Sequence, residues 1–189
     1  MKHGVYVAIG GLLMSLAAPV ALADWKDGLA ALEKRQFGQA RSACIDDARR
    51  GDAVAQWIAG GASLALYLQD KTPAPSKAQM QEGCGLLGQA AEQGFPPALM
   101  QYGACLLFAK QGGLDEEDVV RMLAYKLAAL KQLPEDAGIQ EEIADTSAAN
   151  DPALRASAQQ MADAMAARFA PVSRWSDALH ALKQREDAP

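Results

Sequence analysis

Apolar residues along this chain recur with the period of an α-helix. After Asp52 they form one continuous stripe, spaced three or four residues apart: Val54, Trp57, Ile58, Gly61, Leu64, Ala65 and Leu68. A later stripe places four side chains on one face: Met80, Cys84, Leu87 and Ala91. This spacing matches the helical repeat of about 3.6 residues, whereas a half-buried strand alternates with a period of about two. Both segments are therefore predicted to be helices.

Glycine, proline and polar residues divide the rest of the chain into further short helices. The first predicted helix begins near Asp24 and ends before a turn at 36–39. The second runs to Arg50, where Gly51 stops it and Asp52 can cap the next helix. Later breaks are expected at 94–97, 111–113, 134, 150–152 and 171. We expect roughly seven to nine helices, most of them about 12 to 18 residues long, and no strand.

The composition supports an all-α fold. Alanine, the best helix former, supplies 40 of the 189 residues, whereas the β-branched residues Val, Ile and Thr together supply 14 and aromatic residues 6%. The net charge is −5, and no basic run is longer than Arg49–Arg50. A nucleic acid is therefore not an expected partner, because binding to phosphates requires a clustered basic surface.

Residues 1–23 have the pattern of a secretory signal peptide. A short positive start at Lys2 precedes the uncharged apolar stretch 5–16, and Ala21–Leu22–Ala23 is a small-residue cleavage site followed by Asp24. We predict cleavage between Ala23 and Asp24, although an uncleaved anchor helix is the alternative, because 4–23 carries no charge. No second long apolar run follows, so no membrane insertion is expected after cleavage. The expected location is periplasmic or secreted, in a bacterium.

An internal repeat changes the expected architecture from a bundle to an array. The segment 48–60 recurs as 91–103, an offset of 43, with small residues aligned at four positions: Ala48 and Ala91, Gly51 and Gly94, Ala55 and Ala98, Gly60 and Gly103. A weaker third copy lies at 125–129. Gly51 and Gly94 suit the left-handed conformation at the end of a helix. The small residues would allow neighbouring helices to approach closely.

These repeats resemble the Sel-one-like repeats, a branch of the tetratricopeptide-like α-solenoids. That family has a helix ending A-A-x-x-G, followed by x-x-x-A-x-x-x-L-G, and the stretch 90–103 fits this pattern with Tyr102 in place of leucine. The first copy departs from it at Asp47 and at Ala59. The segments 24–40 and 158–171 look like the helices that often open and close such arrays. The resemblance implies a right-handed α-solenoid of stacked antiparallel helix pairs over 24–133, capped by the C-terminal helices of 134–189.

Candidate catalytic and cofactor motifs have structural interpretations. Gly83–Cys84–Gly85–Leu86–Leu87–Gly88 is formally G-x-G-x-x-G, but no strand precedes it, so we interpret its glycines as small residues at a crowded helix crossing. His180 is the only histidine after the signal peptide, which is too few for a histidine-based zinc site or a catalytic triad. The closest approach to a nucleophile elbow, 61–65, lies within a predicted helix.

Paired carboxylates are the remaining candidates for acid–base chemistry. They occur at Asp46–Asp47, Asp115–Asp118 and Glu141–Glu142, next to expected helix starts or on expected polar faces. We interpret them as solvated or helix-capping groups. The sequence therefore predicts no catalytic residues, no metal ligands and no cofactor, and the protein is not expected to be an enzyme.

The three cysteines are compatible with more than one disulfide pairing. Cys84 lies about ten residues before the turn near Gly94 and Cys105 about ten after it, so the two would face each other across an antiparallel hairpin. A Cys84–Cys105 disulfide is the first prediction. A Cys44–Cys84 bridge between successive repeats is an alternative, as is a core in which all three cysteines are reduced.

Two functions remain open from the sequence. The repeat, the lack of visible catalytic groups and the signal-peptide pattern together favour an exported, non-catalytic scaffold that binds another protein, of unknown identity, through its concave surface or an open end. The alternative is a binder or weak hydrolase of a small cell-wall-related ligand in the same fold.

The aromatic residues have expected places as well. Trp57, Tyr102 and Tyr125 are expected in the core. Trp175 follows Pro171 in a polar segment and belongs either to a capping helix or to a docking surface.

Overall fold

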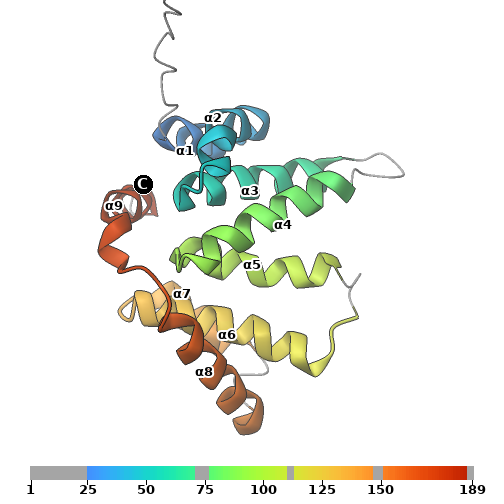
Figure 1. The fold of residues 1–189 in the computed structure, drawn as a ribbon, viewed down its shortest axis with the longest axis vertical. Helices are drawn as coiled ribbons and strands as arrows, with labels where there is room; N and C mark the ends of the chain where they lie inside the picture. Colours follow the sequence, from blue (N-terminus) through green and yellow to red (C-terminus); the bar gives the residue numbers. More distant parts are fainter. Residues whose placement is uncertain (1–24, 71–76, 110–112, 147–150, 187–189) are drawn as a thin grey trace, which may run out of the picture.

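The computed structural model describes residues 25–70, 77–109, 113–146 and 151–186. Within these ranges every regular element is helical, which confirms the all-α prediction (Figure 1). The elements are α1 (Trp25–Glu33), α2 (Phe37–Arg49), α3 (Ala53–Gln69), α4 (Lys77–Glu92), α5 (Pro96–Ala109), α6 (Glu116–Gln132), α7 (Ala137–Ala144), α8 (Pro152–Ala166), the 3₁₀ turn η2 (Val172–Trp175) and α9 (Ser176–Glu186).

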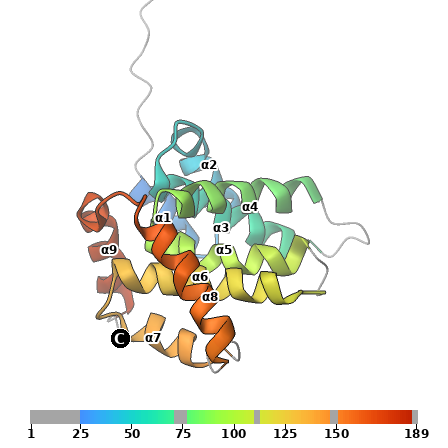
Figure 2. The ribbon, with the colours of Figure 1, turned by 60° about the horizontal axis from the view of Figure 1, so that its bottom comes forward.

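Successive helices pack against one another from α1 to α6, so the array is built from contacts between sequence neighbours. In Figure 1, α3, α4, α5 and α6 follow one another down the molecule. α8 then packs against α6, and Figure 2 shows it crossing in front of that helix. The packing of neighbouring helices is thus observed, whereas the right-handed superhelix and the capping role of 134–189 stay predictions.

Aspartates begin several of these helices. Asp52 accepts a hydrogen bond from the Ala55 N–H at 2.7 Å, and Asp136 caps α7 in the same manner through the Ile139 N–H. Asp115 and Asp118 form a reciprocal capping box at the start of α6. Each cap satisfies a backbone N–H that has no partner inside its helix. The predicted helix-start role of the Asp115–Asp118 group is confirmed.

Two glycines end helices in the left-handed conformation, as the repeat predicted. Gly51 has φ +96° and Gly94 has φ +85°, and they occupy the same place in the two repeats. The turn between the first two helices lies earlier than predicted, because Arg35 adopts φ 55° and α2 already begins at Phe37. The predicted turn at 36–39 is therefore wrong, because Arg35, which is not a glycine, adopts the left-handed conformation and makes the turn before residue 36.

The glycines of the G-x-G-x-x-G pattern lie inside α4 and not at the strand-to-helix turn that a dinucleotide-binding motif requires. A Cβ on Gly83 would stand 2.9 Å from the Gly60 carbonyl oxygen of α3, and a Cβ on Gly60 would stand 2.9 Å from that of Gly83. Gly88 lies under the ring of Tyr102, whereas Gly85 has open space around it. The interpretation as a crowded crossing is confirmed for Gly83 and Gly88 and is wrong for Gly85.

The apolar stripe predicted for 54–68 describes α3 only in part. From Ala53 to Gly60 every residue is buried, because α2 lies against one side of this segment and α4 against another. A helix enclosed on several sides needs no polar face. Leu68, at the other end of α3, is 63% exposed, so its predicted place on the buried stripe is wrong.

The polar core residue Gln56 joins the two repeats. Its side-chain amide donates to the Ala48 carbonyl oxygen at 3.1 Å and to Gln89 Oε1 at 3.0 Å, and its own oxygen accepts from Gln93 Nε2 at 2.9 Å. Gln93 also donates to the carbonyl oxygen of Gly51. These bonds satisfy a buried amide and tie the end of α2 to the end of α4.

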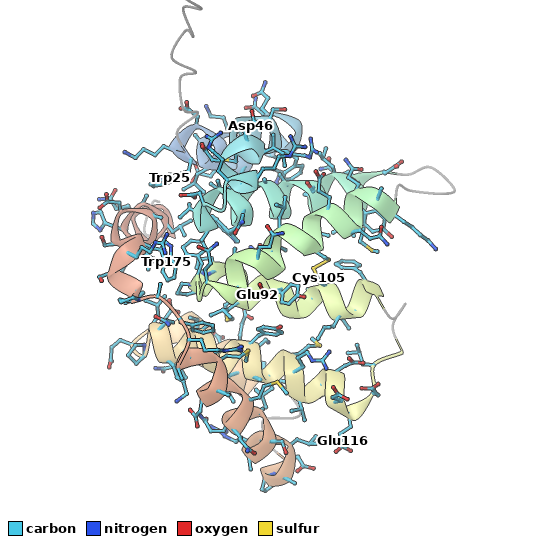
Figure 3. All side chains as sticks on the ribbon, viewed as in Figure 1. Trp25, Asp46, Glu92, Cys105, Glu116 and Trp175 are labelled. Atoms are coloured by element: carbon cyan, nitrogen blue, oxygen red, sulfur yellow. A yellow bond between two sulfur atoms is a disulfide. The ribbon has the colours of Figure 1, made fainter. Side chains whose placement is uncertain are left out.

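The segment after α8 returns to the middle of the array. Phe169 lies directly against Gly94, and the Ala170 N–H donates to the Gln93 carbonyl oxygen at 3.4 Å. Trp175 is 5% exposed and contacts the ring of Phe95 edge to face, with ring centres 5.6 Å apart. Figure 3 shows Trp175 between the α9 region and the array. Trp175 is thus an internal anchor for the C-terminal segment.

No helix in the described ranges combines the length and the apolar character needed to cross a membrane. The predicted signal peptide and its predicted cleavage site between Ala23 and Asp24 lie outside the described residues.

Candidate binding groove

A groove of about 910 Å³ lies where four parts of the fold meet. Its walls come from Trp57 in α3, the N-terminal half of α5, the continuous segment 132–142 from the end of α6 through α7, and α9. Most of its lining is apolar: Trp57, Pro96, Pro97, Met100, Leu133, Pro134, Ala137, Ile139, Leu179 and Leu182. An apolar concavity of this size, with a few polar groups, is typical of a binding site.

Three aromatic rings, those of Trp57, Phe95 and Trp175, pack in a row in the core next to the groove. Trp57 contacts Phe95 edge to face at 5.7 Å, and Phe95 contacts Trp175 in the same manner. Phe95 is completely buried, so both tryptophans are held by the core. The Trp57 Nε1–H is also buried and has no acceptor among the described residues. This packing fixes the first turn of α9, and the helix supplies Leu179 and Leu182 to the groove.

The charged groups on the rim are mainly acidic. The lining includes three acidic residues, Glu135, Asp136 and Glu142, and one cationic residue, Lys183. Asp136 is engaged in capping α7, and Glu142 lies 3.5 Å from Lys126 Nζ. Glu135 and Lys183 are both exposed, and neither forms an ion pair with another described residue. The rim therefore offers exposed groups of both signs beside an apolar floor.

Two glutamine side chains supply the uncharged polar groups of the groove. Gln101 comes from α5 and Gln132 from the last turn of α6. Neither amide bonds to another residue within the described parts of the chain. A glutamine amide offers two N–H donors and one oxygen acceptor, so each can pair with a peptide group of an occupant.

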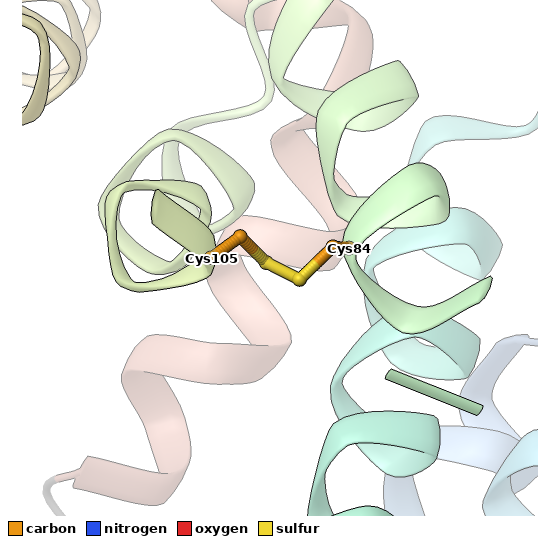
Figure 4. Close-up of a disulfide and its surroundings, with 2 residues drawn as sticks. All are labelled: Cys84 and Cys105. Carbon is orange, nitrogen blue, oxygen red and sulfur yellow. A yellow bond between two sulfur atoms is a disulfide. The ribbon is translucent and has the colours of Figure 1, made fainter. Parts of the chain in front are cut away.

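Cys84 and Cys105 face each other between α4 and α5, with their Cα atoms 5.6 Å apart (Figure 4). This is the pairing that the hairpin argument placed first, at a separation normal for a disulfide. Cys44 is buried in α2 beside Gly28 and lies outside the pair, so the alternative Cys44–Cys84 bridge is not the one observed. The pair lies outside the groove lining and staples the two helices of the second repeat.

Two half-buried tyrosines form a separate contact between α5 and α6. The rings of Tyr102 and Tyr125 meet edge to face, with centres 5.1 Å apart. Burial, together with the neighbouring Tyr102, raises the pKa of Tyr125 to about 12. Trp57 is buried as predicted, whereas the two tyrosines are only partly buried.

The other candidates for chemistry have local structural roles. Ser63 is buried and donates to the Ala59 carbonyl oxygen at 2.8 Å. Asp46 and Asp47 pair with Arg49 and Arg50 on the last turn of α2. The ring of His180 contacts the Gln184 amide on the exposed face of α9. Among the described residues no group of three or more His, Cys, Asp or Glu side chains has the arrangement of a metal site.

The groove itself was not predicted from the sequence, which pointed to the concave surface in general. Of its lining residues, Trp57 was predicted to lie in the core, and 96–97 and Pro134 were predicted to be breaks between helices. The available signal was Leu179 and Leu182, spaced by three on an otherwise polar C-terminal helix. Comparison with protein-family models, with curated proteins and with solved structures finds no match.

Proposed function

We propose that the protein is an exported, non-catalytic helical-repeat scaffold that binds another protein in the bacterial envelope. The observation that carries this proposal is the apolar groove beside α9, whose floor is built from proline, leucine, methionine and isoleucine side chains. A solvent-facing apolar concavity held by a rigid core is the usual form of a protein-binding surface. The export pattern of residues 1–23 and the Cys84–Cys105 pair support an oxidising compartment.

Site-specific photo-crosslinking in the native envelope tests this function. A photoreactive phenylalanine analogue replaces Leu182 on the groove wall, and in a matched variant it replaces Ser157, an exposed residue of α8 outside the lining. We expect irradiation to produce a discrete protein adduct from position 182 and none from position 157. Met100, which lines the groove from α5, should produce the same adduct.

The pattern across positions decides the result. If position 157 produces the same adduct as 182 and 100, or if neither groove position produces a protein adduct, the groove is not a protein-binding surface. Retention of the helical circular dichroism spectrum by each variant shows that an absent adduct does not result from unfolding.

The volume of the groove keeps a second function in view, namely the binding of a small cell-wall-related ligand. About 910 Å³ lies within the range of small-molecule sites. Soluble murein fragments would then raise the melting temperature of the mature chain, and Leu182→Asp would remove that rise. A melting temperature unchanged by saturating fragments would exclude this second function.

A further inference from the structure

The helix α9 is attached to the rest of the fold mainly through its first turn. Trp175, directly before α9, and Ala178 within it are 5% and 3% exposed, and Trp175 packs on Phe95. Each of α1 to α8 packs extensively against another described helix, whereas α9 has an extensive contact only with η2. Figure 1 shows α9 at the edge of the molecule, beside the stack of α3 to α6. The helix therefore has one firm attachment, and its later turns are held loosely.

The later turns of α9 border a groove whose other walls are also apolar. Leu179 and Leu182 are three positions apart, so they lie on one face of the helix, and both are only half-buried. Met100 of α5 and Leu133 of the segment 132–142 line the same groove and are likewise half-buried. Apolar area on α9 and on these walls is thus left in contact with water, and bringing the two together would remove it from water.

The exposed charges at the rim of the groove are complementary between α9 and the segment 132–142. Lys183 comes from α9, next to Leu182, and Glu135 comes from the segment 132–142. Both side chains are exposed, and neither has an ion-pair partner among the described residues. A movement of α9 toward that segment would bring these opposite charges together, which adds a modest attraction to the burial of apolar area.

We propose that α9 is a hinged strap over the groove and turns about its attachment at Trp175 and Ala178. The structure shows the strap in its open position. In the closed position Leu179 and Leu182 cover the apolar lining contributed by α5 and 132–142, and Lys183 pairs with Glu135. The closed strap takes the place of a partner and so lowers the affinity of the groove for other proteins. This regulatory role rests on the proposed protein-binding function, whereas the movement of α9 does not.

The distance between two spin labels measures the movement of α9 directly. The labels are attached through His180→Cys on α9 and Gln140→Cys on α7, both exposed positions outside the groove lining, in a chain in which the buried Cys44 is changed to alanine. We expect double electron–electron resonance to show two distances, of which the longer belongs to the open position. A control pair at Ser42, exposed on α2, and Gln140 excludes α9 and should show a single distance.

Charge reversal tests the contact that closes the strap. Lys183→Glu and Glu135→Lys should each reduce the population with the shorter distance about two- to fivefold, and the two changes together should restore it. Lys77→Glu makes the same change at an exposed position outside the groove and should leave both populations unaltered. The helical circular dichroism spectrum of each variant is measured in parallel, so that a changed distance is assigned only to folded protein.

A single distance between positions 180 and 140, or populations that Lys183→Glu and Lys77→Glu change equally, would overturn the strap. The regulatory role has a separate readout, because opening the strap with Lys183→Glu should raise the yield of the protein adduct from the photoreactive group at position 100. An adduct yield that stays the same while α9 opens would overturn that role. Absence of an adduct in every variant would instead reject the proposed function, and the distances would still decide whether α9 moves.

Discussion

Replacing Gly94 with alanine should destabilise the protein more than the same replacement at Gly51. Both glycines end a helix with positive φ, at equivalent places in the two repeats. Their surroundings differ, because an added Cβ at Gly51 meets nothing within 4 Å, whereas at Gly94 it would lie 2.5 Å from Phe169 Cβ and 2.8 Å from Phe169 Cδ2. The pair therefore separates a conformational cost from a packing cost.

The magnitudes follow from these two terms. A left-handed non-glycine residue costs about 1 to 2 kcal/mol, and this is the whole effect expected for Gly51→Ala. Gly94→Ala adds the cost of overpacking against Phe169, about 1 to 3 kcal/mol. The expected loss of unfolding free energy is about 2 to 5 kcal/mol at Gly94. Gly94→Val should cost at least as much, since a β-branched residue resists positive φ more strongly.

Urea unfolding of the mature chain, followed by its helical circular dichroism, measures both losses on the same scale. A double-mutant cycle adds Phe169→Gly, which removes the contacting atoms, and the combined effect should be smaller than the sum of the two single effects. Equal losses at Gly51 and Gly94, or strict additivity with Phe169→Gly, would refute the claim that the C-terminal segment packs on this turn.

Three further predictions concern the helix crossing, the cysteine pair and Tyr125. Gly83→Ala should lower the unfolding free energy by about 1 to 3 kcal/mol, because its Cβ meets the Gly60 backbone. Gly85→Ala, in open space on the same helix, should raise it by about 0.5 to 1 kcal/mol. Changes of the same sign at both sites in urea unfolding would contradict the close crossing at Gly83. Changing Cys84 and Cys105 together to serine should lower the unfolding free energy by about 2 to 3 kcal/mol, and a reductant should have no further effect on this variant. Peptide mapping of the unaltered protein that recovers both cysteines as free thiols would contradict the disulfide. The pKa of Tyr125 is raised from 10.0 to about 12, so the unfolded chain loses this proton first, and stability should be unaffected below pH 10 and fall as the pH rises toward 12. Tyr125→Phe should reduce that fall, and tyrosinate absorbance that rises in one step near pH 10 would show that the pKa is not raised.

The local features of the fold were predictable because each has a short sequence signature. Gly51 and Gly94 at matching positions predicted two left-handed helix ends, and Asp52 and Asp115 predicted helix starts, since these residues act through neighbours within four positions. The hairpin geometry of α4 and α5 placed Cys84 and Cys105 opposite each other.

What could not be predicted depends on contacts between distant segments. The burial of α3 on several sides arises from α2 and α4 together, so a one-faced stripe described it incompletely. Gln56 aligns with the apolar Leu99 of the next repeat, and nothing near it in sequence reveals its bonds to Gln89 and Gln93. The groove is assembled from four separate parts of the chain, so periodicity within any one of them does not reveal it.

The return of the C-terminal segment to the Gly94–Phe95 turn has a consequence for the order in which the fold is assembled. A chain that emerges from its N-terminus can form α1 to α5 early, because those helices contact their immediate successors. Leu179 and Leu182 arrive last, and the groove has no α9 wall until Trp175 reaches Phe95. Incomplete or C-terminally cut chains would thus be folded in their first half and yet lack one wall of the groove, which restricts the complete groove to chains that retain α9.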